Sequence, residues 1–343
     1  MNILGIIASA VSGNLAPPPA VAITTNDNGT PAVLYTYPWS PGFGTKFADP
    51  ASVITDIAQG VAFTDKGDAI AVGHSSSPFV TAYPWSVTGF GTKYADPATL
   101  PAGTGRGLRW NPAGDVLAVT HSTTPFISVY AWSAGFGSKY ANAATLLPAV
   151  GLDAMFKSGG DVLAVAHGLT PFISAYAWSS GFGTKYANPA TLPTGTGQSI
   201  NFNAAGDTIA MAHTASPGVT VYPWSAGFGT KYADPATLPS GSPTNGVAFR
   251  PQGDAIAVAA NGSPYILVYP WSAGFGTKYA DPATLPAGLG EAVAWSRAGT
   301  AVAITSSSPG EVAAYPWSAG FGTKYANPAT PPTGTQLTDI KFV

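Results

Sequence analysis

The sequence contains no cysteine, few charged residues and no long hydrophobic run. Without cysteine, the chain has neither a disulfide framework nor thiol chemistry. Charged residues make up only 9% and the net charge is −2. This excludes nucleic acid as a partner, because binding to it depends on many Lys and Arg side chains that neutralise phosphates. No stretch approaches the ~18 apolar residues of a membrane helix, so we expect no membrane insertion.

Glycine, proline and a repeated phrase dominate what remains. The chain has 41 Gly and 32 Pro among 45% hydrophobic residues, a composition typical of short apolar strands separated by turns. The dipeptide Trp-Ser recurs every 46 or 47 residues, at Trp39, Trp85, Trp132, Trp178, Trp224, Trp271 and Trp317. A period in the forties with several strands per repeat indicates a β-propeller. We therefore predict an all-β, seven-bladed β-propeller with these tryptophans as repeated structural residues.

A single repeat supports four strands per blade. Strands are predicted at 246–249, 255–259 and 266–269, with a short fourth strand starting at 278–280. Asp281-Pro282 ends the fourth strand, because proline cannot donate to a strand ladder. The second strand alternates small with large apolar residues in every repeat, as at 69–73. Successive side chains point to opposite faces, so both faces are expected to be buried, with bulky faces packed on thin ones.

The two ends of the chain are predicted to share one blade. Residues 20–24 match second strands, whereas residues 338–342 match first strands. The C-terminal strand would complete the N-terminal blade, close the ring and remove two open sheet edges. The propeller domain is therefore assigned to residues 20–343. In its period, strand number and strand-terminal Trp it resembles WD40-type propellers. It lacks their Trp-Asp dipeptide, so no site residues are transferred from that family.

Residues 1–19 lie outside the repeats. They combine the apolar side chains Ile3, Leu4, Ile6 and Ile7 with a proline-rich spacer at 16–19. A signal peptide cleaved after Ala10 is one interpretation, although no basic residue precedes the apolar run. The other is a segment that docks on a partner, either by adding a strand or by filling a groove. The prolines would then hold the propeller away from that partner.

A resemblance favours the docking interpretation. The leader at 4–9 (LGIIAS), followed by Ser12-Gly13, resembles the opening of tailed-bacteriophage virion proteins. The blade phrase GFGTKYA, followed by Asp or Asn and PAT, is similar to repeats of phage-encoded WD40-like proteins. The resemblance implies a non-enzymatic virion protein, bound to other virion proteins of the capsid or tail through Ile3, Leu4, Ile6 and Ile7. The alternative is a propeller lectin that binds host-surface glycan.

Four histidines occupy one repeat position. They follow the second strand in four consecutive blades, at His74, His121, His167 and His213. Equivalent positions on different blades lie far apart around a ring, whereas a metal needs ligands that converge. We therefore expect local hydrogen bonds at each histidine, with no metal and no cofactor.

Seven lysines also recur at one position. They are Lys46, Lys93, Lys139, Lys185, Lys231, Lys278 and Lys324. Lysines on outer strands protect an edge from pairing with another sheet. The alternative is a basic girdle that contacts anionic glycan or a neighbouring subunit. Three residues after each lysine, Asp and Asn replace one another, which is typical of turns and not of acid–base catalysis.

Only a few charged residues depart from the repeat. They are Arg106, Arg109, Asp153, Lys157, Glu291, Arg297 and Glu311. Enzyme sites in propellers break the repeat symmetry, but these exceptions are scattered along the chain. No Ser-His-Asp order, phosphate loop or isolated carboxylate pair accompanies them. The sequence therefore predicts that the protein is not an enzyme.

Overall fold

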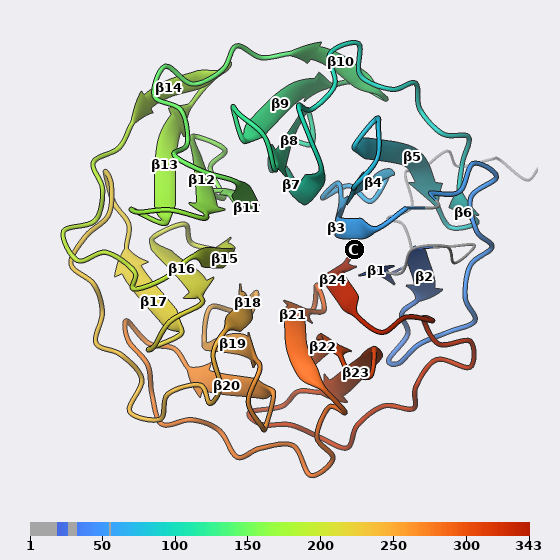
Figure 1. Ribbon diagram of the computed structural model, residues 1–343. Coiled ribbons are helices and arrows are strands. Elements are labelled where there is room, and N and C mark those ends of the chain that lie inside the picture. The colour runs from blue at the N-terminus through green and yellow to red at the C-terminus, as the bar shows by residue number, and fades with distance from the viewer. Residues whose placement is uncertain (1–18, 27–32, 55) are drawn as a thin grey trace, which may run out of the picture.

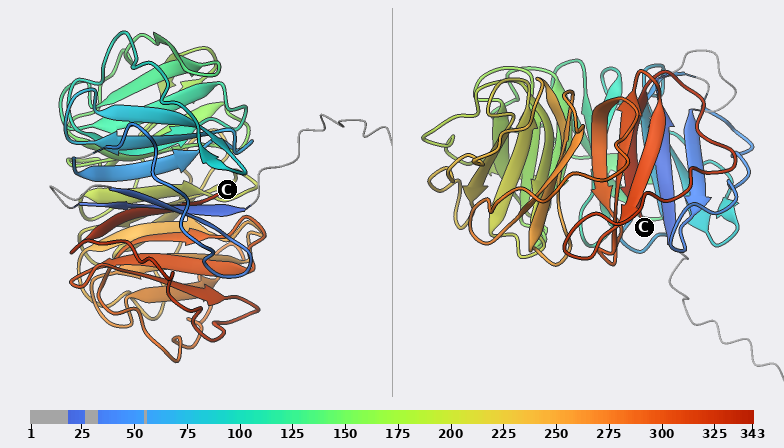
Figure 2. Two further views of the ribbon diagram at one scale, coloured as in Figure 1. Left: turned by 90° about the vertical axis from the view of Figure 1, so that its right-hand side faces the viewer. Right: turned by 90° about the horizontal axis from the view of Figure 1, so that it is seen from below.

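The described part of the computed structural model consists of β-strands and turns. It covers residues 19–26, 33–54 and 56–343, and no helix occurs within these ranges. Seven antiparallel sheets stand around a common centre, as a β-propeller requires (Figure 1). Seen from the side, the ring is a short cylinder whose sheets stand next to one another (Figure 2).

The sheets are numbered here in chain order, and each is given from its inner to its outer strand. Sheet 1 contains β24 (Leu337–Phe342), β1 (Ala20–Thr25) and β2 (Leu34–Pro38). Sheet 2 contains β3 (Ala58–Phe63), β4 (Ala69–His74), β5 (Val80–Ser86) and β6 (Gly89–Phe90). Sheet 3 contains β7 (Gly105–Trp110), β8 (Val116–His121), β9 (Ile127–Trp132) and β10 (Phe136–Lys139). Sheet 4 contains β11 (Gly151–Phe156), β12 (Val162–His167), β13 (Ile173–Trp178) and β14 (Phe182–Lys185).

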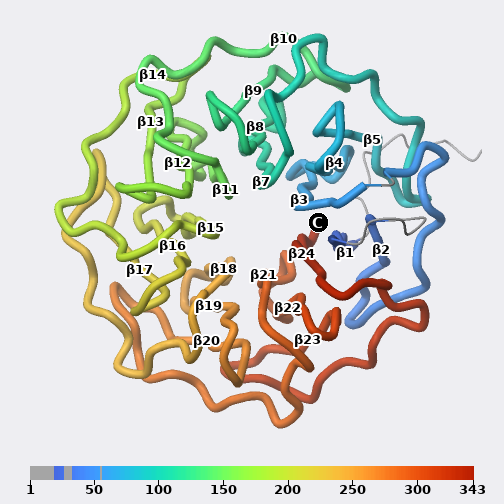
Figure 3. Tube along the Cα trace, in the orientation of Figure 1, coloured from blue at the N-terminus to red at the C-terminus, as the bar shows by residue number. Residues whose placement is uncertain are grey.

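The remaining three sheets have three strands each. Sheet 5 contains β15 (Gly197–Phe202), β16 (Thr208–His213) and β17 (Val219–Pro223). Sheet 6 contains β18 (Thr244–Phe249), β19 (Ala255–Ala260) and β20 (Ile266–Pro270). Sheet 7 contains β21 (Leu289–Trp295), β22 (Ala301–Ser307) and β23 (Glu311–Pro316). Peripheral segments carry the chain from the outside of one sheet to the inner strand of the next (Figure 3).

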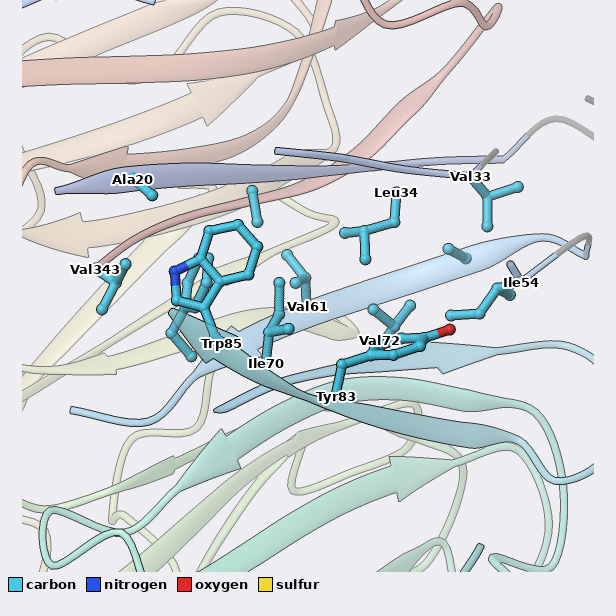
Figure 4. Packing of buried hydrophobic residues seen from close by; sticks show 13 residues of the cluster. Ala20, Val33, Leu34, Ile54, Val61, Ile70, Val72, Tyr83, Trp85 and Val343 are labelled. Atoms are coloured by element: carbon cyan, nitrogen blue, oxygen red, sulfur yellow. The ribbon is translucent and has the colours of Figure 1, made fainter. Parts of the chain in front are cut away.

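Neighbouring sheets pack bulky faces onto thin ones. In β4, Ile70 and Val72 lie in the apolar cluster shared with Ala20 of sheet 1 (Figure 4). On the opposite face of β4, Ala69 and Ala71 lie in the cluster shared with sheet 3. Every residue of β4 is buried, because each of its faces is covered by a neighbouring sheet. The alternation in the second strands therefore produces the packing that the sequence predicts.

The seven repeated tryptophans lie in aromatic clusters between the sheets. Trp224 contacts Phe202 and Phe228 of its own repeat, and Tyr186 of the preceding one, with ring centroids 4.9–5.5 Å apart. All three contacts are edge-to-face, and each such pair is worth about 0.5–1.5 kcal/mol beyond the burial of its area. All seven tryptophans are buried. They therefore fasten each outer hairpin to the inner strand of its own sheet and to the preceding repeat.

A buried tyrosine lies two residues before each tryptophan, and in six of the seven repeats its hydroxyl donates to a carbonyl of the linker between sheets; the exception among the described residues is Tyr130. The Tyr222 hydroxyl donates to the Thr191 carbonyl at 2.7 Å, and Tyr269 makes the same bond to Thr237 at 2.8 Å. Each threonine belongs to the segment that connects the preceding sheet to the sheet of its tyrosine. Burial raises the pKa of Tyr83, the equivalent residue of sheet 2, to about 12, so its hydroxyl stays protonated and remains a donor.

The two ends of the described chain meet in sheet 1. Strand β24 pairs antiparallel with β1, with Val21 opposite Phe342 and Ile23 opposite Ile340. The Val343 and Ala20 backbones also bond to each other. Strand β24 lies between the inner strands β3 and β21 at the centre (Figure 1). The pairing that the sequence predicts between the C-terminal and N-terminal strands is present.

The prediction of a fourth strand in every sheet is correct only in part. Sheets 2, 3 and 4 have four strands, whereas in the other four the same segment forms only a single bridge, such as Trp271 to Phe275. The expected fourth strand at 278–280 is not formed, and the four-residue strands β10 and β14 begin earlier, at the phenylalanine. In the three-stranded sheets, the residue before the tryptophan is proline, which cannot donate to an additional strand.

Removal of β24 tests the shared sheet. A chain that lacks residues 337–343 leaves sheet 1 without its inner strand and opens two edges, because β24 bonds to β1 and packs against β3 and β21. We expect aggregation, or loss of the single cooperative transition in thermal unfolding. A synthetic peptide of residues 335–343 should restore part of the transition when added in trans. A truncated chain that melts like the full chain would show that the pairing contributes little.

Candidate functional site

The inner strands enclose a polar cavity at the centre of the ring. Its volume is ≈ 380 Å³, and its lining comes from inner strands of all seven sheets. Most lining side chains are neutral, as with Gln59, Gln198 and Asn245. The charged lining residues are Arg106, Arg109, Asp153, Glu291, Asp339 and Lys341. The cavity therefore combines cations and carboxylates with amides that can bind hydroxyl groups.

The pattern of each inner strand decides which residues reach this cavity. In β7 (GRGLRW), Leu108 and Trp110 are buried between the sheets, whereas Arg106, Gly107 and Arg109 are partly exposed. Alternate residues of a strand point to opposite sides, and a shift of register after Gly105 brings Arg106 to the same side as Arg109. The contacts between sheets thus determine the residues at positions 108 and 110. The residues that face the cavity can instead serve a function.

The two arginines of β7 lack partners for part of their donors. The Nε atoms of Arg106 and Arg109 are buried and bond to no atom of the described chain. Neither guanidinium forms an ion pair with the residues of ranges 19–26, 33–54 and 56–343. Burial lowers the pKa of Arg106, but an arginine remains charged at neutral pH. Two cations with unused donors form a candidate site for an anion or an oxyanion.

Asp153 and Asp339 hold neighbouring inner strands together. Asp153 accepts hydrogen bonds from its neighbour Ala154 N and, across to sheet 5, from Ile200 N at 3.0 Å. Asp339 makes the equivalent bonds, to Ile340 N and to Val61 N of sheet 2. Burial raises the pKa of Asp153, while the positive charges of Lys341 and Arg109 act in the opposite direction. These two carboxylates are therefore occupied in joining sheets.

Some inner strands carry glycine at the position that Asp153 and Asp339 occupy in theirs. At such a glycine, the inner strand of the next sheet approaches more closely. A Cβ atom on Gly60 would lie 2.2 Å from the Arg106 carbonyl oxygen. On Gly107 it would lie 2.6 Å from the Asp153 Cα atom. Side chains cannot fit at either place. The close contacts that these glycines allow set β7 between β3 and β11 and so place the two arginines.

Glu291 is the carboxylate that remains available. Its Oε1 accepts a bond from the Ser307 hydroxyl at 2.6 Å, and its Oε2 accepts one from Asn245 Nδ2 at 3.3 Å. Asn245 is itself fixed by donating to the Gly290 carbonyl at 2.9 Å. Neutral donors thus orient Glu291, and no cation of the described chain forms an ion pair with it. An oriented carboxylate without a counter-ion can accept a proton from a substrate or from water.

The structure gathers four of the seven exceptional charged residues that the sequence shows as scattered. Arg106, Arg109, Asp153 and Glu291 line the cavity, because each lies on an inner strand. The other three lie outside the lining: Lys157 pairs with Asp161, Glu311 pairs with Lys324, and Arg297 donates to the Asp65 carbonyl. Sequence reasoning missed Asp339 and Lys341. Alignment of the seven inner strands in register would have revealed them as departures from the repeat.

Each histidine makes the same local bond. The Nε2 atom lies 2.9–3.0 Å from the hydroxyl of a Ser or Thr seven residues later, for example His121 with Ser128 and His213 with Thr220. Within the described ranges, no group of three or more His, Asp or Glu side chains could hold a metal ion. The histidines are buried and belong to the packing of the second and third strands.

The predicted docking residues Ile3, Leu4, Ile6 and Ile7 lie outside the described residues, as does most of the assigned 1–19 segment. The prediction that they bind other virion proteins therefore stays a prediction. In the part of the chain that the structure covers, no helix has the length and apolar character needed to span a membrane.

Comparison with known proteins shows the fold. No family model matches the chain, and no curated protein is similar to it in sequence. A candidate 6-phosphogluconolactonase from Bacteroides uniformis superposes with TM-score 0.68 at 13% identity, over 95% of this chain and 99% of the other. The periplasmic gluconolactonase PpgL of Pseudomonas aeruginosa gives 0.70 at 14%, over 95% and 99%. The β-propeller domain of Cps50 (Swd1) from Myceliophteria thermophila gives 0.57 at 16%, over 80% and 89%.

These comparisons contradict the functional prediction made from the sequence. The resemblance to WD40-type propellers holds for the architecture. The non-enzymatic virion protein, with a glycan-binding lectin as its alternative, was wrong, because similar structures are named as gluconolactonases and none of these likenesses points to a bacteriophage. The prediction that the protein is not an enzyme fails for the same reason. It treated the charged exceptions as isolated, whereas four of the seven line one cavity.

The buried histidines predict a loss of stability in acid. Desolvation lowers the pKa of all four to about 4, from about 6.5 in an unfolded chain. Between these values the unfolded chain binds protons that the folded chain does not. The free energy of unfolding should therefore fall as the pH drops from about 6.5 towards 4, by roughly 2 kcal/mol per histidine at pH 5.

A double variant isolates this effect from other acid-sensitive groups. His121→Ala and His213→Ala introduce the residue that sheet 6 carries at this position, Ala260. Urea unfolding at pH 7 and pH 5 should show a smaller loss of stability in the variant than in the wild type. The comparison uses the difference between the two pH values, so a change in stability at pH 7 does not affect it. An unchanged difference would mean that the histidines are protonated in the folded protein.

Proposed function

We propose that the seven sheets form one closed β-propeller and that its central cavity hydrolyses a lactone of a polyhydroxylated acid. The observation that carries this proposal is the presence, in one cavity, of an unpaired guanidinium and an oriented carboxylate without a counter-ion, Arg106 and Glu291. Both lie four positions before the last residue of their inner strand and interrupt a repeat that otherwise carries a neutral residue there: Gln59, Leu152, Gln198, Asn245 or Thr338. The gluconolactonase names of two similar structures support the same reaction class.

The chemistry assigns one role to each side chain. Glu291 accepts the proton of a water molecule as the water oxygen attacks the lactone carbonyl carbon. Arg106 donates hydrogen bonds to the oxyanion that forms on the carbonyl oxygen. The tetrahedral intermediate collapses by breaking the bond between the carbonyl carbon and the ring oxygen, and the proton returns from Glu291 to that oxygen. The product is a hydroxy acid, whose carboxylate an arginine can bind through two parallel N–H bonds.

The rest of the cavity fits a hydroxylated substrate. Gln59, Gln198 and Asn201 line it with amide donors and acceptors, which match the hydroxyl groups of a sugar acid. A volume of ≈ 380 Å³ is near the lower end of small-molecule sites. Arg109 and Lys341 add positive charge to the same lining. Together they favour a small polar molecule that is, or becomes, an acid.

Hydrolysis of defined lactones tests the proposal. Purified protein is assayed in a pH-stat with glucono-δ-lactone, 6-phosphogluconolactone and a galactonolactone, against spontaneous hydrolysis. We expect a rate above background with at least one of them. Arg106→Gln and Glu291→Gln should each lower kcat/KM about 100-fold or more, because each removes a group that acts in the transition state.

Two ion-paired residues outside the cavity provide matched controls. Arg250→Gln removes a guanidinium bound to Asp254, and Glu311→Gln removes a carboxylate bound to Lys324. Both should leave the rate within a few-fold of the wild type. The proposal is overturned if no lactone is hydrolysed faster than in buffer, or if the control variants lose as much activity as the cavity variants while all remain folded.

A further inference from the structure

Sheets 3 and 4 differ from the other five at the outer edge of the ring. Only these two have four-residue outer strands, β10 and β14, and they are neighbours (Figure 1). They are also the only two with alanine before the repeated tryptophan, at Ala131 and Ala177. The other five sheets have proline there: Pro38, Pro84, Pro223, Pro270 and Pro316.

The alanine accounts for the longer strand. Proline has no N–H group, so it cannot donate to an additional outer strand, whereas Ala131 and Ala177 can. In β10 and β14 the two central residues are exposed, and no further strand pairs with their outer edge in the described chain. Each therefore presents a short unpaired edge with backbone donors and acceptors directed outwards, although its register against the third strand is irregular.

The charge of the outer edge changes in the same two sheets. Five of the seven repeated lysines form ion pairs: Lys46 with Asp49, Lys93 with Asp96, Lys231 with Asp234, Lys278 with Asp281 and Lys324 with Glu311. Lys139 and Lys185 instead donate to the neutral amides of Asn142 and Asn188. These two lysines have no carboxylate partner among the residues that the structure describes. The four-residue outer strands are thus also those with unneutralised positive charge.

A groove lies beside one of these edges. Its volume is ≈ 320 Å³, and it is lined by Tyr94, Ala95 and residues 131–137, which include the start of β10. The groove gives side chains of an added strand a place to pack. Three independent features, namely strand length, charge and shape, therefore coincide at sheet 3, and two of them are repeated at sheet 4.

We propose that β10 and β14 bind an extended acidic peptide segment of a partner protein by strand addition. The backbone of the segment would pair with the free edge of each strand, and its Glu or Asp side chains would pair with Lys139 and Lys185. Backbone bonds supply the affinity in this mode of recognition, and the side chains supply the selectivity. The site is on the outer rim and is independent of the central cavity and of lactone hydrolysis.

The other five sheets provide the substitutions for the test. The probe is a fluorescein-labelled peptide of alternating Val and Glu, eight residues long, and its Val-Lys counterpart is the control. Fluorescence anisotropy should show binding of the acidic peptide only. Ala131→Pro with Ala177→Pro restores the proline of the other sheets and should weaken binding at least tenfold. Asn142→Asp with Asn188→Asp restores the neutralising carboxylate and should weaken it comparably.

A gain of binding completes the test. Pro223→Ala with Asp234→Asn gives sheet 5 the two features of sheets 3 and 4, and should raise the number of bound peptides from two to three. Thermal unfolding checks the fold of each variant, and the Asn variants decide the question if the proline variants do not fold. The proposal is overturned if the acidic peptide fails to bind the wild type at millimolar concentration, if the basic peptide binds equally well, or if the folded variants bind as the wild type does.

Discussion

Each sheet of this protein is stable only between two neighbours, because its second strand buries both faces. In β4, Ile70 and Val72 fill the space against sheet 1, whereas Ala69 and Ala71 make room for the bulky residues of sheet 3. A row of such sheets would leave one apolar face exposed at either end. The pairing of β24 with β1 joins the two ends of the described chain within one sheet, and β24 packs against β3 and β21 of the sheets on either side. The aromatic clusters around the tryptophans then fasten the outer parts of neighbouring repeats.

The same constraint determines where chemistry can reside. Buried positions of the inner strands, such as Leu108 and Trp110, serve the contacts between sheets, so the residues that face the centre can vary without disturbing the core. Some of these residues still join the strands, as Asp153 and Asp339 do by accepting backbone bonds from the next sheet. The Arg106 guanidinium forms no ion pair with the described residues, and Glu291 accepts bonds only from the side chains of Asn245 and Ser307. The combination of Arg106 and Glu291 in the cavity is therefore better explained by a ligand than by the fold.

Much of the fold could be predicted from the sequence, because the residues that recur in every repeat are those that pack between the sheets. The spacing of the tryptophans, the alternation in the second strands and the match of residues 338–342 to first strands were sufficient for the ring and for the pairing of its ends. The outer strands could not be predicted from the repeat, since one residue, proline or alanine, separates the four-residue outer strands from the others, and sheet 2 forms a two-residue strand despite Pro84. The cavity could not be predicted either, because its charged residues come from four inner strands and are up to 235 positions apart, from Arg106 to Lys341. The function inferred from residues 4–9 and from the repeated GFGTKYA segment was wrong. The repeated segment serves aromatic packing and contains none of the cavity residues.

In a repeat protein, some residues differ from their equivalents in the other repeats. Where such a residue lies in the structure is more informative than the difference itself. The four histidines are equivalent in sequence, and the ring separates them, so each makes only its own bond to a nearby hydroxyl. Arg106 and Glu291 are 185 positions apart, yet the ring places both at one cavity. At the rim, Ala131 and Asn142 change together, and the same pair of changes recurs in the adjacent sheet at Ala177 and Asn188. Packing alone requires neither coincidence, because five other sheets fold with proline and four with aspartate at those positions. Departures that converge therefore mark the parts of this ring whose residues are not explained by the packing of its sheets.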